Sequence, residues 1–394
     1  MAGIVTLAIL CINCGSSSLK FCVFGCADGA NVEWVRGAVE GIASEKSLLW
    51  FKRSEIGTRQ EWPQSIPNHL DALGAAMTSI AGLNLPSFSA IGHRVVHGGR
   101  DFQGPTLVDG EVLKSLQSIV PFAPLHLPAQ IAMIKVSQSR FPTVRQVACF
   151  DTTFFREMPE LAKRYPLPTE LWDAGVRKYG FHGLSYESII ESCAEASQGR
   201  TIIAHLGNGC SMTALLDGRP IDTSMGFTPA GGLMMGTRCG DLDPGVIVHL
   251  IDRLGYGAQD IQSLTNMQSG LLGVSGLSSD MQTLLACRDQ NQNAALAIEM
   301  FCDRARKQIG AFAATLGGLD AFYFTAGIGE RSYVIRSEIC KGLGFLGIDL
   351  DKALNEAHSQ RISTKTSKCK VYVVPSNEER TIARQTVQES TRES

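Results

Sequence analysis

Residues 205–211 read His-Leu-Gly-Asn-Gly-Cys-Ser and end an apolar run that starts at Thr201. The apolar run predicts a buried strand, and Gly-Asn-Gly predicts a tight turn. Small residues at a turn let backbone N–H groups approach an anion closely. A lone Gly-x-Gly favours an ordinary strand–turn–strand. Residues 236–244, however, read Gly-Thr-Arg-Cys-Gly-Asp-Leu-Asp-Pro, and one arginine among glycines and aspartates is typical of a polyanion site.

A similar pattern stands near the start of the chain. Residues 4–12 are almost continuously apolar, which predicts a strand buried on both faces. Asn-Cys-Gly-Ser-Ser-Ser-Leu-Lys follows at 13–20, strand character resumes at 21–24, and Asp28-Gly29 predicts a turn. Hydroxyls, amides and one lysine would gather there, as they do around phosphate oxygens. The segment is not a P-loop, because Gly-x4-Gly-Lys-Ser/Thr is absent and no helix follows.

These two segments suggest an internal duplication. Residues 12–18, with Asp-Gly at 28–29, echo residues 204–210, with Asp-Gly at 217–218. Both copies read as strand, small-residue turn, strand and Asp-Gly turn. We therefore expect two related halves, each with a phosphate-holding hairpin, and a nucleotide in the cleft between them.

Two further segments have the same character. Residues 321–330 predict a buried strand, a Gly-x-Gly turn at 327–329 and a helix over 332–342, whose N-terminus would suit nucleotide phosphates. Residues 371–379 predict a strand followed by a capping box between Ser376 and Glu379, which would leave Glu378 to point at a metal. The clearest helix, over 293–316, is expected to serve packing only.

Length and charge exclude several classes of protein. The 394 residues favour two domains, and the composition, 44% apolar and 19% charged, is that of a globular protein. A net charge of −2 offers no basic field for nucleic acid or anionic lipid, so a small-molecule partner is expected. No apolar run reaches membrane-spanning length and no basic region precedes residues 1–12, so we expect a cytoplasmic protein.

The cysteines and histidines do not predict a zinc site. Cys11 and Cys14 form the close CxxC, but on a strand their side chains would point to opposite faces. Most other cysteines stand singly in apolar segments, where a free cysteine behaves as a small hydrophobe. His93 and His97 lie four apart in a predicted strand, so the helical metal spacing fails.

Taken together, the motifs resemble those of the acetate kinase family over nearly the whole chain. The matching motifs are Asn-x-Gly-Ser-Ser-Ser-x-Lys at 13–20, His-Arg-Val-Val-His-Gly-Gly at 93–99, Pro-Leu-His at 124–126, Phe-Asp-Thr at 150–152, Tyr-Gly-Phe-His-Gly at 179–183, the block at 205–244, Gly-Ile-Gly-Glu at 327–330 and Asn-Glu-Glu at 377–379. The resemblance implies an α/β fold of two duplicated actin-like, ribonuclease-H-like domains with the active site in the cleft between them. The domains would be residues 1–152 with 380–394, and residues 153–379, which carry most of the nucleotide site. The resemblance also implies a homodimer. The enzyme would catalyse reversible, Mg²⁺-dependent phosphoryl transfer between ATP and acetate, giving ADP and acetyl phosphate, with Mn²⁺ as an alternative ion.

The resemblance also implies roles for individual residues. Asn13 and Glu378 would hold the metal, and Arg94 would hold the substrate carboxylate. The catalytic residues would be Asp151, His182 and Arg238. The acyl group would be surrounded by Val96, Leu125, Phe181 and Pro229. The nucleotide would contact Lys20, His205, Leu206, Gly207, Asn208, Gly209, Asp280, Met281, Gln282, Gly327, Ile328, Gly329, Glu330 and Arg331.

Elementary chemistry refines these roles. A migrating phosphoryl group spreads negative charge over its oxygens, which suits Arg238 as a permanently charged planar donor and His182 as a second donor. A carboxylic acid of pKa about 4 is already ionised at pH 7, so acetate needs no general base. We therefore expect Asp151 to orient a metal-bound water or Arg238 instead. A branched side chain at Val96 would favour acetate over propionate without excluding the latter.

The chain departs from the family pattern at several positions. Gln282 stands where the family commonly has arginine, and Arg331 where it commonly has asparagine. Leu127, Phe155 and Tyr186 replace residues that are usually polar near the active-site motifs.

Three other interpretations remain open at this point. A related kinase could act on propionate or butyrate. An actin-like or chaperone-type ATPase would hydrolyse ATP slowly without acetate, but gives no reason for Arg94 beside an apolar pocket. A dinucleotide oxidoreductase is disfavoured because Gly-x-Gly-x-x-Gly does not follow the first strand.

Overall fold

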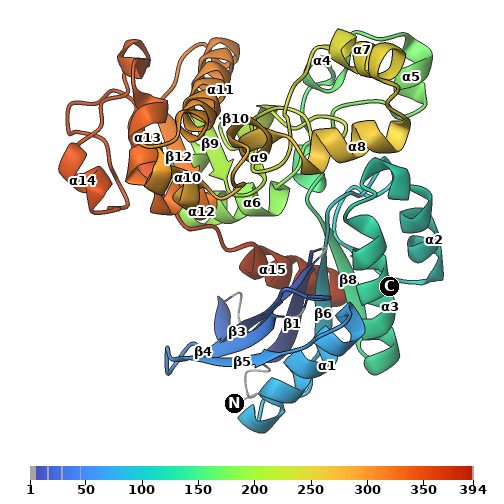
Figure 1. Ribbon diagram of the computed structural model, residues 1–394. Coiled ribbons are helices and arrows are strands. Elements are labelled where there is room, and N and C mark those ends of the chain that lie inside the picture. Colours follow the sequence, from blue (N-terminus) through green and yellow to red (C-terminus); the bar gives the residue numbers. More distant parts are fainter. Residues whose placement is uncertain (1–5, 16, 28–29, 45, 393–394) are drawn as a thin grey trace. The chain divides into compact units, whose positions relative to one another are not determined.

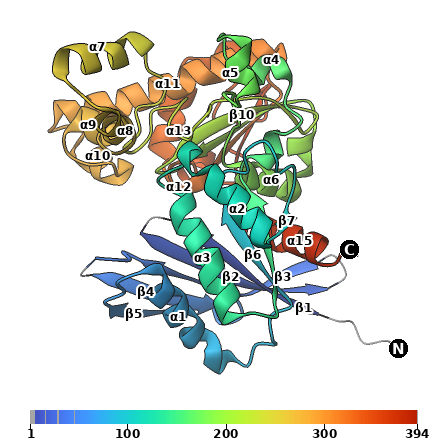
Figure 2. The same ribbon diagram turned by 90° about the vertical axis from the view of Figure 1, so that its right-hand side faces the viewer.

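The computed structural model describes residues 6–15, 17–27, 30–44 and 46–392 (Figures 1 and 2). Its chain divides into two compact units. Unit 1 comprises residues 1–154 and 377–394, and unit 2 comprises residues 155–376. The segment that carries Glu378 therefore belongs to unit 1, whereas the sequence places it in the second domain.

Unit 1 is built on one mixed sheet with the strand order β5-β4-β3-β2-β1-β6-β8-β7. β1 to β5 form an antiparallel meander, β6 runs parallel to β1, β8 runs parallel to β6, and β7 is an antiparallel edge strand. The strands are β1 Leu7–Cys14, β2 Ser18–Ala27, β3 Ala30–Glu40, β4 Ser47–Arg53, β5 Arg59–Gln64, β6 Ala90–Val95, β7 Thr106–Leu107 and β8 Arg145–Phe150. The turn expected at Asp28-Gly29 lies outside the described residues, as does Ser16 of the first motif.

Helices cover both faces of this sheet (Figure 2). α1 and α3 pack on one face, over a core that includes Leu10, Ile12 and Cys14. α15 packs on the other face, where Ile382 and Thr386 fill the space beside Gly92. The helices of unit 1 are α1 His69–Ile80, α2 Gly110–Ser118, α3 Leu127–Arg140 and α15 Glu378–Ser390, with 3-10 turns η1 Ala81–Leu83 and η2 Val120–Phe122; a further 3-10 turn, η3 Thr153–Phe155, spans the boundary between the units.

Unit 2 contains a five-stranded sheet with the order β11-β10-β9-β12-β13. Its strands are β9 Arg200–Leu206, β10 Cys210–Leu216, β11 Arg219–Thr223, β12 Ala321–Thr325 and β13 Lys370–Val373. Its helices are α4 Glu160–Lys163, α5 Thr169–Asp173, α6 Gly183–Ser192, α7 Pro244–Leu254, α8 Ala258–Met267, α9 Gly270–Ser275, α10 Met281–Cys287, α11 Gln292–Leu316, α12 Ala326–Arg331, α13 Tyr333–Cys340 and α14 Lys352–Glu356, with 3-10 turns η4 Ala194–Ser197 and η5 Leu343–Leu346.

The two sheets share one topology, which confirms the duplicated α/β fold. In unit 1, β3-β2-β1 is an antiparallel hairpin series followed by the parallel strands β6 and β8. In unit 2, β11-β10-β9 is the same series, followed by the parallel strands β12 and β13. The Asp217-Gly218 turn joins β10 to β11 with both residues at positive φ, 49° and 76°. The sequence echo between residues 12–18 and 204–210 therefore reflects equivalent hairpins.

The long packing helix is also confirmed. α11 buries Ile298, Phe301, Ala305, Ile309 and Phe312 along one stripe, as the 3.6-residue period predicts. It ends at Gly317, whose φ of 71° an L-residue adopts only with strain.

Two local predictions are wrong. The N-cap of α15 is Asn377, not Ser376, because the Asn377 side chain accepts from the backbone N–H of Arg380. Glu379 contacts Arg36 at 2.9 Å instead of closing a capping box. Gly327 and Gly329 lie inside the short helix α12, not in a turn that precedes a helix. The helix predicted over 332–342 corresponds to α13, and Ser332 is its N-cap.

The cysteines are free thiols, and most are buried. Cys14 packs with Leu10 and Ile12 on the face of β1 under α1 and α3. Cys11 faces the other way, directly across from Cys22 in the β1–β2 register. Burial raises the pKa of Cys14 to about 12, so these thiols serve packing. In the part of the chain that the structure describes, no helix is long and apolar enough to cross a bilayer.

Candidate active site

Three polar residues of unit 1 stand at the ends of adjacent parallel strands. Asn13 is near the end of β1, Arg94 is near the end of β6, and Asp151 directly follows β8. The strands β1, β6 and β8 are neighbours in the sheet and run in the same direction. Their carboxyl ends therefore bring the three side chains to one edge, where α/β sheets commonly bind ligands.

Arg94 and Asp151 form a two-pronged ion pair. The guanidinium Nε lies 3.1 Å from Asp151 Oδ1, and Nη2 lies 2.7 Å from Asp151 Oδ2. Asp151 is fully buried, and the side chain of Arg94 is 20% exposed. Such a fork fixes the plane of the guanidinium as well as its position. The sequence did not predict this pairing, since it matched Asp151 with Arg238.

Glu378 and Asn13 complete the cluster on the other side of the guanidinium. Arg94 Nη1 lies 3.3 Å from both Asn13 Oδ1 and Glu378 Oε2, and Asn13 Nδ2 lies 3.5 Å from the same carboxylate oxygen. Glu378 reaches this point because it is the first residue of α15. All three guanidinium nitrogens thus have a partner within the cluster, which holds Arg94 in one orientation.

Burial and charge act against one another in this cluster. Burial raises the pKa of Asp151 to about 6, with Arg94 opposing the rise and Glu378 adding to it. For Arg94, burial lowers the pKa, but Asp151 and Glu378 outweigh it and hold the guanidinium charged. Two carboxylates, those of Asp151 and Glu378, therefore surround the single positive charge of Arg94. Their excess negative charge would attract a further cation.

The oxygen atoms of the cluster suit a hard divalent cation. Asn13 and Glu378 offer an amide and a carboxylate oxygen, the donor types that Mg²⁺ takes, and Mg²⁺ typically uses one or two carboxylates together with substrate phosphates. Among the described residues, no group of three or more histidine, cysteine or acidic side chains is placed to hold a metal. The donor set thus fits a metal shared with a phosphate ligand rather than an all-protein cage.

Of the remaining predicted residues of unit 1, Lys20 and Val96 lie at this edge. Lys20 is exposed and stands directly across from Asn13 in the β1–β2 register. Val96 is 5% exposed, and its backbone N–H donates to Gln130 Oε1 at 3.0 Å. Leu125 is 37% exposed.

In unit 2 the equivalent strand end carries two histidines. His205 is near the end of β9, and His182 is the N-cap of α6. Their rings stack with centroids 4.1 Å apart and planes 19° apart. The Nδ1 of each ring lies 2.8 Å from a serine hydroxyl, Ser211 for His182 and Ser185 for His205. Both Nε2 atoms therefore face away from the serines, toward the turn that follows β9.

That turn brings His182 and Arg238 together. A Cβ added to Gly209 would lie 3.2 Å from Arg238 Nη1 and 3.4 Å from His182 Nε2. Glycine at this position thus leaves a space between a guanidinium and an imidazole. Arg238 Nη1 also donates to the carbonyl oxygen of Pro229 at 3.0 Å, which orients the guanidinium without cancelling its charge.

Phe181, the fourth predicted acyl-contacting residue, precedes His182 and is fully buried. His182 itself has a φ of 60°, an uncommon conformation for a residue other than glycine. Such conformations persist where the surrounding structure holds them in place, and they gather at functional sites.

The Gly-Asn-Gly turn is held in shape by a neighbouring loop. The N–H of Gly207 donates to the carbonyl of Gly209 at 3.1 Å, and the N–H of Gly236 donates to the carbonyl of Asn208 at 3.0 Å. A Cβ at Gly236 would lie 2.1 Å from Asn208 Oδ1, so any other residue there would force the Asn208 side chain to move. Leu206, before the turn, is fully buried.

The predicted nucleotide segment 327–331 is fixed at both ends of α12. Glu330 Oε1 accepts from the N–H groups of Ala326 at 2.8 Å and Ser376 at 3.2 Å. At the other end, the fully buried Arg336 donates to the carbonyls of Gly329 and Glu330 at 2.8 and 2.9 Å. The Glu330 carboxylate thus has a structural role. Gly327, Ile328 and Arg331 are partly or fully accessible on this rigid segment.

The segment 280–282 serves the start of another helix. Asp280 is the N-cap of α10 and accepts from the N–H and hydroxyl of Thr283 at 2.8 and 2.7 Å. Met281 is buried, whereas Gln282 is exposed. Of these three side chains, Asp280 and Gln282 are exposed, and Asp280 is engaged as the cap.

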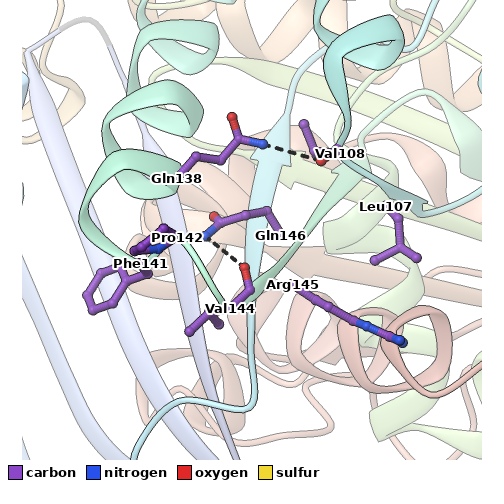
Figure 3. A pocket seen from close by; sticks show the side chains of 8 residues that line it. All are labelled: Leu107, Val108, Gln138, Phe141, Pro142, Val144, Arg145 and Gln146. Carbon is purple, nitrogen blue, oxygen red and sulfur yellow. Dashed lines mark hydrogen bonds between the residues drawn. The ribbon is translucent and has the colours of Figure 1, made fainter.

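One hollow of unit 1 lies elsewhere (Figure 3). Its volume is about 250 Å³ and its walls include Leu107, Pro142, Arg145 and Gln146. In Figure 3 the amides of Gln138 and Gln146 turn toward the carbonyls of Val108 and Val144. The hollow lies at the start of β8, whereas Asp151 follows the end of that strand, about 20 Å away at 3.3 Å per residue. It is not part of the candidate site.

Sequence reasoning missed several residues that shape the site. Ser185, Ser211, Tyr186 and Arg336 hold the histidines and α12, yet no motif singled them out for such a role. A period-2 pattern was a usable signal for Ser211, because it stands on β10 opposite His205 in the β9–β10 register. The Arg94–Asp151 pair could have been found from strand order, since both residues stand at the ends of neighbouring strands.

Comparisons with known proteins agree with this arrangement. Residues 8–384 match the model of the acetokinase family. The chain is 41% identical to an acetate kinase of Clostridium botulinum over 401 residues, which span 97% of this chain and 99% of the relative. Among solved structures, an acetate kinase of Porphyromonas gingivalis has a TM-score of 0.86 at 37% identity, covering 97% of this chain and 99% of its own. A propionate kinase of Francisella tularensis has a TM-score of 0.90 at 37% identity, covering 97% and 100%. The chain therefore belongs to the acetokinase family and is a kinase that transfers a phosphoryl group to a carboxyl acceptor.

Proposed function

We propose that this protein transfers the γ-phosphoryl group of ATP to acetate, reversibly, to give acetyl phosphate and ADP. The observation that carries the proposal is the convergence of Arg238 and His182 on the space beside Gly209. In a direct in-line transfer, an acetate oxygen forms a bond to the γ-phosphorus while the bond to the bridging oxygen breaks. ADP leaves with that electron pair, and no covalent enzyme intermediate forms.

The donors of unit 2 suit the transferring group. Charge in the transition state spreads over the equatorial oxygens of the phosphoryl group, where fixed cationic donors act most strongly. The Arg238 guanidinium and the His182 Nε2–H would bind those oxygens. The turn at His205 to Gly209 would lie against the remaining phosphates, with Lys20 as a further cation.

The cluster of unit 1 suits the acceptor and the metal. Acetate is ionised at neutral pH, so Asp151 is needed to orient Arg94 rather than to remove a proton. The Arg94 guanidinium would hold the acetate carboxylate by its positive charge. Asn13 and Glu378 would hold Mg²⁺, or Mn²⁺ in its place, which supplies positive charge to the phosphate oxygens. The adenosine would rest on Gly327 to Arg331 and on Asp280 to Gln282.

The acyl wall favours a short substrate. Val96, Leu125, Phe181 and Pro229 would surround the methyl group of acetate. One extra methylene in such a pocket changes the free energy by about 1–3 kcal/mol, so propionate is expected to be a poorer substrate. Propionate is the second candidate acceptor, because the similar Francisella tularensis structure is a propionate kinase.

We also propose how the chain assembles, on the basis of the exposed apolar side chains of α7. α7 buries none of its residues, and it exposes Val246, Val248, Ile251 and Leu254. An apolar helix face of this kind suits contact with a second copy of the chain, so we propose a homodimer joined through α7. The two units would act as the two actin-like domains of a cytoplasmic enzyme that binds neither nucleic acid nor membrane.

Trapping of the acyl phosphate tests the proposed function. Purified protein is incubated with ATP, Mg²⁺ and hydroxylamine, with acetate, propionate or butyrate at matched concentration. Hydroxamate should form fastest with acetate, and its formation should stop when metal is chelated and resume with Mg²⁺ or Mn²⁺. ATP hydrolysis at the same rate with and without a carboxylic acid would overturn the proposal in favour of an ATPase. Faster formation with propionate would reassign the acceptor.

A further inference from the structure

Two buried hydroxyl groups in series hold the ring of His182. Ser211 Oγ lies 2.8 Å from His182 Nδ1, and the Tyr186 hydroxyl lies 2.5 Å from the same serine oxygen. Ser211 and Tyr186 are fully buried, and His182 is 9% exposed. The series starts in α6, crosses β10 and returns to the residue that caps α6.

Tyr186 and Phe155, which depart from the family pattern, are in contact. Their rings meet edge to face with centroids 6.0 Å apart. Phe155 also fills the space next to Gly180, where an added Cβ would lie 2.4 Å from its ring. Phe155 thus packs both the backbone two residues before His182 and the tyrosine that bonds to Ser211. The two substitutions form one packed unit behind the histidine.

We propose that Tyr186 and Ser211 are positioning residues that fix the tautomer of His182, so that Nε2 carries the hydrogen and points at the transferring anion. The proposal deepens the proposed function and rests on it for the identity of that anion. Nε2 is the ring nitrogen near Gly209 and Arg238, so its proton decides whether the ring donates a bond there.

The number of hydrogens on the hydroxyl groups favours the tautomer of His182 that carries its hydrogen on Nε2. Each hydroxyl of the series has one hydrogen. A phenol is a stronger acid than an aliphatic alcohol, so Tyr186 donates to Ser211, which then donates its own hydrogen to His182 Nδ1. A neutral imidazole that accepts at Nδ1 carries its hydrogen on Nε2. In the opposite direction Nε2 would present a lone pair to Arg238 and to a phosphoryl oxygen, and a lone pair repels that oxygen.

The neighbouring histidine supplies a natural comparison. His205 Nδ1 is also bonded to a serine, Ser185, at the same 2.8 Å, and its Nε2 lies near Gly207. Removal of the Ser211 or Tyr186 hydroxyl should therefore alter His182 and leave the His205 tautomer unchanged.

Two substitutions test the proposal by kinetics. Ser211→Ala is expected to lower kcat by about 10- to 100-fold, and Tyr186→Phe by about tenfold. These losses are smaller than or equal to the loss of about 10²–10³-fold that follows removal of one charge-stabilising donor, because the His182 ring itself remains. KM for ATP and acetate should change less than about twofold, since the hydrogen bond forms fully in the transition state. In a His182→Ala background, Ser211→Ala should have no further effect on kcat. Tyr323→Phe is the matched control, because the buried Tyr323 hydroxyl has no hydrogen-bond partner among the described residues, and its kcat should equal that of the wild type.

A second readout needs no turnover. Nitrogen-15 spectra of the full-length protein with labelled histidine distinguish the two neutral tautomers, and His182→Gln identifies the signals of His182 among the eight histidines. The wild type should show the Nε2–H form, and Ser211→Ala should show a mixture of tautomers. Ser185→Ala should change the His205 signals and leave those of His182 in place.

The outcomes separate the two proposals. An unchanged His182 tautomer in folded Ser211→Ala protein, or wild-type kcat in both variants, would overturn the positioning role. A loss in Tyr323→Phe as large as that in Tyr186→Phe would do the same, because it would reflect packing alone. If the wild type forms no acyl phosphate, the proposed function fails, while the tautomer result still stands or falls by the spectra.

Discussion

Units 1 and 2 place polar residues at the same point of the same sheet topology, but the two sets differ in charge. At the strand ends of unit 1, the buried carboxylate of Asp151 and the carboxylate of Glu378 surround one guanidinium, Arg94. At the strand ends of unit 2, two stacked imidazoles and the guanidinium of Arg238 gather around a glycine turn. The first set has an excess of negative charge and the second an excess of hydrogen-bond donors.

The difference shows how a duplicated fold can offer two kinds of ion site at equivalent positions. Carboxylate and amide oxygens attract a divalent cation, and imidazoles and a guanidinium attract a phosphoryl anion. The sheet topology determines where the ion-binding side chains lie, because the carboxyl ends of parallel strands meet at one edge. The side chains at those ends then decide which ion each place attracts.

The largest effect should come from the donor set of unit 2. Arg238→Ala is expected to lower kcat by about 10³-fold, because it removes a fixed charge from the transition state. Arg238→Lys keeps the charge without the planar fork, and should recover only part of the rate. Steady-state kinetics with saturating ATP and acetate measure both. Full activity of Arg238→Ala would remove the basis for the contrast between the units.

The ion pair of unit 1 should have the next largest effect. Asp151→Asn is expected to lower kcat by about 10²-fold, because the amide cannot hold the Arg94 fork with the same charge. Since the pKa of Asp151 is raised to about 6, kcat/KM of the wild type should rise with pH through about 6 and level off above it.

The pH profile provides the check on this second prediction. The acid limb near pH 6 should be absent from Asp151→Asn when kcat/KM is measured between pH 5.5 and 8. Retention of most of kcat with unchanged magnesium dependence would contradict the role given to Asp151.

The space beside Gly209 sharpens the comparison further. In Gly209→Ala the new methyl group would lie 3.2 Å from Arg238 Nη1, closer than most contacts of this kind, and 3.4 Å from His182 Nε2, an ordinary van der Waals contact. Arg238 would have to move by a few tenths of an ångström, which should lower kcat about tenfold. Gly310→Ala, in α11 with open space around it, is the control and should keep the wild-type kcat. Equal rates for the two variants would show that the donors do not converge on this turn.

The smallest effect concerns a histidine of unit 1 that serves stability. His93 is buried and bonded to Gln146 at 2.6 Å, and burial lowers its pKa to about 4, against the opposing effect of that bond. Between pH 6.5 and about 4, the His93 side chain is therefore protonated in the unfolded chain and neutral in the folded chain. Stability should fall as the pH drops through this window, by up to about 3 kcal/mol.

The variant His93→Gln isolates this contribution. Its stability in urea, measured from pH 7 to 4.5, should depend less on pH than that of the wild type. Asp151 acts in the opposite sense, because its raised pKa favours the fold at low pH, and it is unchanged between the two proteins. An identical pH dependence would refute the assignment to His93.

Particular residues show what the sequence allowed. The hairpins, the Asp217-Gly218 turn, the α11 stripe and the helix that begins after Ser332 were predictable, because short-range periodicity and turn chemistry decide them. Asn377 was missed as the cap of α15 because two capping residues stand side by side, and neighbouring contacts select one. The helical Gly327–Gly329 segment was missed because Arg336 and Glu330 hold α12 from distant positions.

The candidate site divides in the same way. The motifs indicated Asn13, Arg94, Asp151, His182, Arg238 and Glu378 without showing which of them touch. The pairing of Asp151 with Arg94 depends on β6 and β8 being neighbours, which no local pattern states. The hydroxyl series behind His182 depends on β10 lying against α6.

The sequence by itself determined the strand and helix types, the duplicated hairpins and the chemical kinds of side chain at the strand ends. These follow from interactions between residues a few positions apart along the chain. The tertiary structure alone decided that Glu378 reaches Arg94 from the far end of the chain, and that Tyr186 reaches His182 through Ser211. Such contacts join residues far apart in sequence, and packing of the whole core fixes them.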